Sequence, residues 1–125
     1  MHGAAAVAEK PGRIEKIFLN EELSSNGIYG FNFYILGVPH TVTIDDKLPL
    51  NSSGTSVFAG VSPDGALWGP LIEKAFAKLH GNYETIIAGD PAHSIEVMTG
   101  APSMTYNHGG YSANSLFEIV KAADA

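Results

Sequence analysis

Residues 28–45 constrain the fold more than any other stretch, because IYGFNFYILGVPHTVTID reads as two β-strands joined by a turn. β-branched and aromatic side chains crowd both halves, which is typical of strands. Gly37 and Pro39 predict a turn that separates a first strand over 28–36 from a second over 40–45. One face of the first strand is apolar, so that face must lie on a core. Its residues are Tyr29, Phe31, Phe33 and Ile35.

The stretch LWGPLIEKAFAKLHGNYE, residues 67–84, predicts a helix with Pro70 near its first turn and Gly81 just past its end. Proline is favoured at the start of a helix and glycine immediately after its last turn. Apolar residues recur at helical spacing and predict a buried face. The predicted core residues are Trp68, Leu71, Ile72, Ala75, Phe76 and Leu79, and the charged residues expected to face water are Glu73, Lys74 and Lys78.

Shorter segments complete an α+β domain in which short helices pack on a β-hairpin. Alanine-rich residues 3–10 predict an N-terminal helix, and Pro11 permits a new helical turn after it. That turn would place Ile14, Ile17 and Phe18 on one face. The remaining predicted elements are a short strand over 56–61, a helix over 92–98 that stops at Gly100, and a final amphipathic helix over 115–125.

Length and charge exclude several classes of function. A chain of 125 residues is about one domain long. Seven basic and thirteen acidic residues give a formal net charge of −6, which repels a phosphate backbone, so we expect no nucleic-acid partner. No apolar run approaches the roughly 20 residues of a membrane-spanning helix, so we expect no membrane span.

Cellular location follows from two further observations. The N-terminal stretch lacks the layout of a secretory signal, and the sequence contains no cysteine that could form a disulfide framework. We therefore expect a cytoplasmic or otherwise intracellular protein, with a cytoskeletal or organellar assembly left open.

Residue types that carry chemistry are present, but none falls into a pattern diagnostic of a site. The five histidines lie at positions 2, 40, 80, 93 and 108, with no two at ligand spacing on one element. Each is interpreted as a surface or hydrogen-bonded side chain. Asp45 and Asp46 would point to opposite faces of a strand, which favours a turn or capping role over a shared cation. No phosphate-binding glycine motif and no Gly-x-Ser-x-Gly elbow occurs.

Three stretches resemble the protease core of the calpain family, papain-like cysteine endopeptidases that calcium activates. The ending Ile-Asp-Asp-Lys-Leu-Pro at 44–49 is similar to the family's Val-Asp-Asp-Arg-Leu-Pro. Residues 67–84 resemble Phe-Trp-Ser-x-Leu-Leu-Glu-Lys-Ala-Tyr-Ala-Lys-x-x-Gly-x-Tyr-Glu almost position for position, and VMTGA at 97–101 resembles Asp-Phe-Thr-Gly-Gly. The resemblance covers residues 4–123 and implies a fragment of a papain-like cysteine protease fold.

The resemblance also implies how the chain divides and what it lacks. Residues 1–103 would be a partial first lobe of the protease core, and residues 104–125 a linker and the first helix of the second lobe. Catalysis in the family needs a cysteine at the head of the first-lobe helix, with a histidine and an asparagine from the second lobe. None of the three can be placed here, so no catalytic residue is assigned, and His80, His93 and His108 lie in the wrong segments for that role.

Two further family features concern calcium and substrate. The family's calcium ligand is a glutamate two residues before the tryptophan, a position that is Ala66 here, and Asp64 is a weak substitute. We therefore expect no bound metal or cofactor, calcium included. The glycine that lines the family's cleft falls at Gly89, which implies backbone contacts to a peptide. The alternative is a loop glycine that needs a positive φ.

The resulting hypothesis is a catalytically inactive calpain-like module with a structural or protein-interaction role in a larger assembly. Apolar faces that the full enzyme would cover usually find a partner, so we expect other protein subunits as partners. The alternative is a fragment of a longer calcium-dependent cysteine endopeptidase whose catalytic Cys, His and Asn lie outside this chain. A third hypothesis, a decoy lobe that pairs with a complete calpain, has no sequence feature in its favour.

Overall fold

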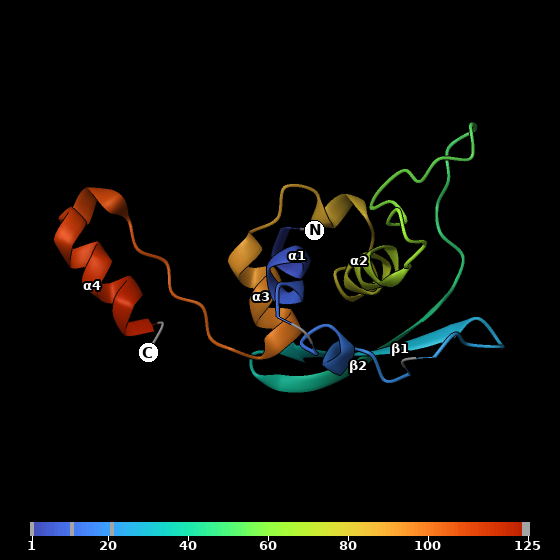
Figure 1. The fold of residues 1–125 in the computed structure, drawn as a ribbon, viewed down its shortest axis with the longest axis horizontal. Coiled ribbons are helices and arrows are strands. Elements are labelled where there is room, and N and C mark those ends of the chain that lie inside the picture. Colours follow the sequence, from blue (N-terminus) through green and yellow to red (C-terminus); the bar gives the residue numbers. More distant parts are fainter. Residues whose placement is uncertain (1, 11, 21, 124–125) are drawn as a thin grey trace.

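The computed structural model describes residues 2–10, 12–20 and 22–123, and it has the predicted α+β architecture (Figure 1). Pro11, Glu21 and the last two residues of the predicted C-terminal helix lie outside the described residues. The helices and strands, in chain order, are α1 (His2–Ala8), the 3-10 turn η1 (Glu15–Ile17), β1 (Ile28–Ile35), β2 (Val38–Asp45), α2 (Trp68–Leu79), the 3-10 turn η2 (Glu84–Ile86), α3 (Pro91–Thr99), the 3-10 turn η3 (His108–Gly110) and α4 (Ala113–Ala123).

The hairpin is confirmed, but its turn is tighter than the sequence predicts. β1 and β2 pair antiparallel, with Ile35 opposite Val38. The two residues between them, Leu36 and Gly37, have φ of 50° and 78°, the left-handed backbone of the two-residue turns that match strand twist. The prediction that Pro39 belongs to the turn is therefore wrong, because Pro39 lies in β2. Both strands of a two-stranded sheet are edges, where proline's missing N–H is tolerated.

One face of the hairpin forms the floor of the core. Tyr29, Phe31 and Phe33 are buried, as predicted, whereas Ile35 beside the turn is 44% exposed. Helices α1, α2 and α3 lie on the same side of the hairpin and cover this face (Figure 1). The Phe31 ring contacts Phe18 with centroids 4.7 Å apart, which ties η1 to β1. The aromatic strand predicted from sequence is thus the base on which the helices pack.

Helix α2 forms as predicted and supplies the opposite side of the core. The backbone leaves the helix at Gly81, whose φ is 105°. Leu71, Ile72 and Ala75 are buried, while Trp68, Phe76 and Leu79 are partly buried against the same core.

The prediction that the charged residues of α2 face water is wrong for Glu73 and Lys74. Glu73 accepts a hydrogen bond from the backbone N–H of Ala59 at 2.6 Å. Lys74 contacts Asp45 at the end of the hairpin. Lys78 is exposed, although its Nζ donates to the carbonyl of Thr43 at 2.6 Å. These side chains fasten the helix to the loop and the hairpin.

Two other segments differ from the predictions. The predicted strand over 56–61 is wrong, because this segment has only an isolated bridge between Leu50 and Ser56. The hydrogen bond from the N–H of Ala59 to Glu73 holds this segment against α2. The helical turn expected after α1 is only the single 3-10 turn η1, although Ile17 within it is buried as predicted.

The last two helices have different surroundings. α3 begins at its N-cap Asp90, which accepts a hydrogen bond from Ala92, and ends at Gly100 with φ of 73°, so this helix is confirmed. α4 is also confirmed, but none of its residues is buried. In Figure 1 it stands apart from the other helices, beyond an extended segment. No helix within residues 2–10, 12–20 and 22–123 is long and apolar enough to cross a membrane.

Candidate functional site

The Gly89 loop lines a cleft between the helices. The cleft has a volume of about 340 Å³ and lies among the start of α1, the middle of α2, η2 and α3. Ile72 and Phe76 come from α2 and Met98 from α3, so its inner wall is apolar. The predicted core residues of α2 therefore have two roles, because they pack the domain and also bound this cleft.

Gly89 itself is not a strained glycine. Its φ is not positive, and the left-handed residue of the loop is Ala88, with φ of 57°. The alternative explanation of Gly89 as a positive-φ residue is therefore wrong. A Cβ at this position would lie 3.5 Å from the carbonyl oxygen of Ile86, an ordinary contact. Packing within the chain does not require glycine here, and its role in binding a peptide stays a prediction.

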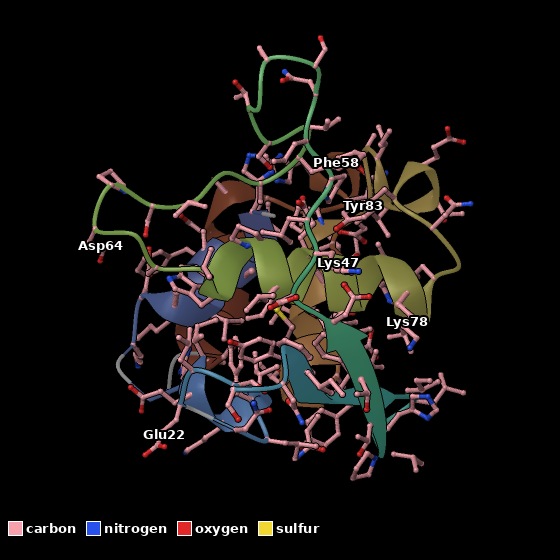
Figure 2. The ribbon with its side chains drawn as sticks, turned by 90° about the vertical axis from the view of Figure 1, so that its right-hand side faces the viewer. Glu22, Lys47, Phe58, Asp64, Lys78 and Tyr83 are labelled. Atoms are coloured by element: carbon pink, nitrogen blue, oxygen red, sulfur yellow. The ribbon has the colours of Figure 1, made fainter. Side chains whose placement is uncertain are left out.

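An aromatic pair forms one rim of the cleft. Phe58 and Tyr83 stack with centroids 4.2 Å apart and planes 7° from parallel, and Figure 2 shows the two side chains beside each other over α2. Burial raises the pKa of the Tyr83 phenol, and the negative charges of Glu73 and Asp45 raise it further. Tyr83 is therefore a neutral hydrogen-bond donor at neutral pH rather than a source of negative charge.

Two histidines meet on the other rim. The Nε2 atoms of His80 and His93 lie 3.1 Å apart, and the His80 ring packs on Phe76 with centroids 4.2 Å apart. His80 is partly buried and His93 is exposed. The interpretation of these residues as hydrogen-bonded histidines is confirmed, but their partnership with each other was not predicted. His80 follows α2 and His93 lies in α3, so spacing within one element gives no signal of their contact.

A second pocket, of about 510 Å³, lies where α2 begins. It is lined by Ala66, Trp68 and Leu71, together with Tyr29 of β1 and residues around η1. Trp68 is only partly buried, so it is a wall of this pocket as well as a core aromatic. Nothing in the sequence distinguishes these two roles, since both place an indole against apolar neighbours.

The calcium position predicted from the family does not fit a calcium ion here. Asp64 accepts hydrogen bonds from the hydroxyl of Ser62 and, at 3.2 Å, from the N–H of Ala66. These bonds, the Ser62 hydroxyl foremost, lower the pKa of the Asp64 carboxyl. Calcium takes six to eight oxygen ligands, whereas Ala66 supplies no side-chain oxygen and Asp64 caps a turn at the surface (Figure 2).

The site has no activated nucleophile within the described residues. The sequence contains no cysteine. Where the structure is described, no serine or threonine hydroxyl is hydrogen-bonded to a histidine, which is the contact a hydroxyl nucleophile needs for activation. The cleft of this chain has an apolar wall, an aromatic rim and an exposed backbone at Gly89.

Comparisons with known proteins agree with this geometry. The sequence model of the calpain family cysteine proteases matches residues 1–125. The calpain-type cysteine protease DEK1 of Zea mays is 36% identical over 97 residues, which is 78% of this chain and 4% of that protein. Human calpain-14 is 41% identical over 81 residues, 65% of this chain and 12% of that protein.

A third relative, calpain-A of Drosophila melanogaster, is 35% identical over 98 residues, 78% of this chain and 12% of that protein. The chain spans between 4% and 14% of the length of the first curated relatives that it matches. Both the family match and the mixed fold of helices on a hairpin agree with a segment of the protease domain. The chain belongs to the calpain family of cysteine proteases.

Proposed function

We propose that this chain is a calpain-like module that binds another polypeptide and does not itself cleave peptide bonds. The chain has no cysteine to supply the thiolate that the family chemistry needs. It keeps the apolar wall of the cleft and the exposed Gly89 loop. A structural or binding role uses these features, whereas hydrolysis would require a nucleophile from elsewhere.

Helix α4 carries this proposal. Its apolar residues recur at helical spacing, and Phe117 and Val120 are 65% and 67% exposed. An amphipathic helix with an exposed apolar face usually docks on another surface. The apolar residues of this face are Leu116, Phe117, Ile119 and Val120.

The occupant that suits this face best is polypeptide that completes a calpain-like fold. The curated relatives are far longer than this chain, so residues equivalent to its faces have further protein available to cover them. We assign residues 1–103 to a partial first lobe and residues 104–125 to a linker and the first helix of the second. The extended segment before α4 and its lack of buried residues support this division. The partner would supply the apolar groove that receives α4.

A second function is favoured by the length of the relatives. In it, these residues are part of a longer calcium-dependent cysteine endopeptidase, and the catalytic Cys, His and Asn belong to the rest of that polypeptide. The cleft at Gly89 would then be part of its substrate site. The intact mass of the native protein separates the two functions, because the endopeptidase requires a polypeptide much larger than 13.2 kDa.

The binding function is tested with the purified chain. We expect self-association in sedimentation experiments, because the apolar face of α4 is exposed. A stable monomer with a sharp cooperative melt would contradict dependence on a partner. Cleavage of a fluorogenic peptide by the chain in the presence of calcium would contradict the absence of catalysis.

A further inference from the structure

His80 and His93 are brought together by two separate helices. His80 is the residue that follows α2, and His93 lies in the first turn of α3. Their Nε2 atoms are 3.1 Å apart, and the two ring planes are nearly perpendicular, at 89°. The intervening segment, residues 81–92, contains the Gly89 loop. The pair therefore closes this loop at its base.

The hydrogen bonds of His80 assign its tautomer. Its Nδ1 lies 2.9 Å from the carbonyl oxygen of Phe76, which can only accept, so Nδ1 carries the proton. The Nε2 lone pair of the neutral ring then points at His93, whose Nε2–H donates to it. A histidine whose second nitrogen donates to a backbone carbonyl is oriented as metal-bound histidines almost always are.

We propose that His80 and His93 together bind a divalent transition-metal ion of the zinc class. Two imidazoles on one tetrahedral ion, with Zn–N distances of about 2.0–2.1 Å, have ring centroids about 5.2 Å apart. The centroids here are 5.4 Å apart. The two rings therefore need to rotate so that both Nε2 atoms face the ion, but they need not move apart. His93 moves its ring proton from Nε2 to Nδ1, and the ion then occupies the place of the shared proton.

The rest of the coordination sphere is open to solvent. His93 is exposed, so an ion can enter without unfolding. The nearby acidic groups are engaged elsewhere, since Glu73 accepts from Ala59 and Asp90 from Ala92. Among the described residues no set of three carboxylate, imidazole or thiol groups could hold an ion, so water fills the other positions. A pair of imidazoles selects zinc, copper or nickel over calcium or magnesium.

Metal binding here would fasten the end of α2 to the start of α3. Both histidines line the same cleft as Gly89, so the ion would hold the cleft wall in one arrangement. An ion that binds the folded chain and not the unfolded one also raises its melting temperature. Metal binding at this pair does not depend on whether α4 has a partner.

The experiment is calorimetric titration of the full chain with ZnCl2, at a pH above the usual histidine pKa of about 6.5. We expect one zinc per chain and no comparable binding of CaCl2. His93→Gln, at an exposed position, and His80→Gln should each weaken zinc binding by more than tenfold, since losing even an outer-shell partner costs roughly 10–100-fold. His40→Gln, at an exposed position on β2, is the control and should bind zinc normally.

Melting curves without metal show whether each variant is folded before it is titrated. Absence of zinc binding by the unmodified chain would overturn the proposal. Unchanged affinity in folded His93→Gln, or equal weakening in His40→Gln, would overturn it as well. Proton-nitrogen NMR spectra of the two imidazoles give an independent readout, because zinc must shift the Nε2 resonance of both rings.

Discussion

The Nζ of Lys74 on α2 lies 2.7 Å from the Oδ1 of Asp45, the last residue of β2. The same nitrogen donates to the carbonyl oxygen of Asp45 at 3.1 Å and to that of Lys47. The Lys74 side chain is only 18% exposed, whereas the Asp45 side chain is 60% exposed. One cation thus joins the helix that lines the cleft to the end of the hairpin that carries the core.

Removing this cation should destabilise the domain. Lys74→Met keeps most of the aliphatic stem but leaves the carbonyl oxygens without their donor, so we expect the free energy of unfolding to fall by about 0.5–1.5 kcal/mol. The matched control is Lys121→Met in α4. Its ion pair with Glu118 is 3.9 Å long and exposed on both sides, so the change should be within about 0.5 kcal/mol. Urea denaturation of both variants measures the two changes in the free energy of unfolding. Equal changes would contradict a stabilising role for the contact between Lys74 and Asp45.

The same contact predicts a dependence of stability on pH. The hydrogen bond from Lys74, aided by the N–H of Lys47, lowers the pKa of the Asp45 carboxyl in the folded chain. A lowered folded pKa gives stability that is present above the unfolded value of about 3.9 and is lost as pH falls through the folded value. Asp45→Asn should therefore lose less stability than the unmodified chain as pH falls below that value.

A double variant identifies the source of this dependence. In a Lys74→Met background, Asp45→Asn should alter the acid limb of the stability curve much less, because the donor that lowers the pKa is gone. Urea midpoints across the acid range measure all four proteins. An undiminished effect of Asp45→Asn in that background would show that Lys74 is not the cause.

Two glycines with the same backbone strain should respond differently to alanine. Gly37 and Gly100 have φ of 78° and 73°, where alanine costs about 1–2 kcal/mol. At Gly37 a Cβ meets nothing within 4 Å, but at Gly100 it would lie 2.8 Å from the Tyr34 ring. Displacing a packed ring typically costs about 1–3 kcal/mol more. In thermal or urea denaturation, Gly100→Ala should be clearly less stable than Gly37→Ala. The reverse order would contradict close packing of Gly100 on the Tyr34 ring.

Gly89 allows folding and binding to be separated. Its φ is not positive and a Cβ there makes only an ordinary contact. Gly89→Ala should therefore leave stability unchanged or raise it by about 0.4–1 kcal/mol, because alanine restricts the unfolded chain. If the loop contacts a peptide through its backbone, the same variant should weaken that binding. A large loss of stability in urea denaturation would instead assign Gly89 a structural role.

Local patterns predicted most of the fold because they act over a few residues. Alternating aromatic residues set the buried face of β1, and Pro70 with Gly81 set the limits of α2. Gly100 ends α3 for the same local reason. What could not be predicted depends on contacts between distant segments. Lys74 reads as a solvent-facing residue until the end of β2 is placed beside it.

In the candidate site too, features set by local sequence could be predicted, and contacts between distant segments could not. Helical periodicity predicted Ile72 and Phe76 as core residues, but it gave no signal that both also line the cleft beside Gly89. The contact of His80 with His93 depends on how residues 81–92 turn back between two helices, which no spacing rule encodes. The stacking of Phe58 on Tyr83 was missed for a similar reason, because the sequence suggested a strand at 56–61 rather than a loop held over the helix.

Helix α4 should contribute binding but almost no stability. None of its residues is buried, so a chain that ends at residue 112 loses no core contact. Its free energy of unfolding in urea should match that of the full chain within about 0.5 kcal/mol.

The substitution pair Phe117→Ser and Val120→Ser, at side chains 65% and 67% exposed, should likewise leave the free energy of unfolding unchanged. The truncation and the double substitution should each abolish self-association or partner binding in sedimentation experiments. Lys121→Met, an exposed change on the same helix, is the control and should leave that binding intact. Loss of folding on truncation would mean that α4 packs on the first lobe, and unaltered association would remove α4 as the docking face.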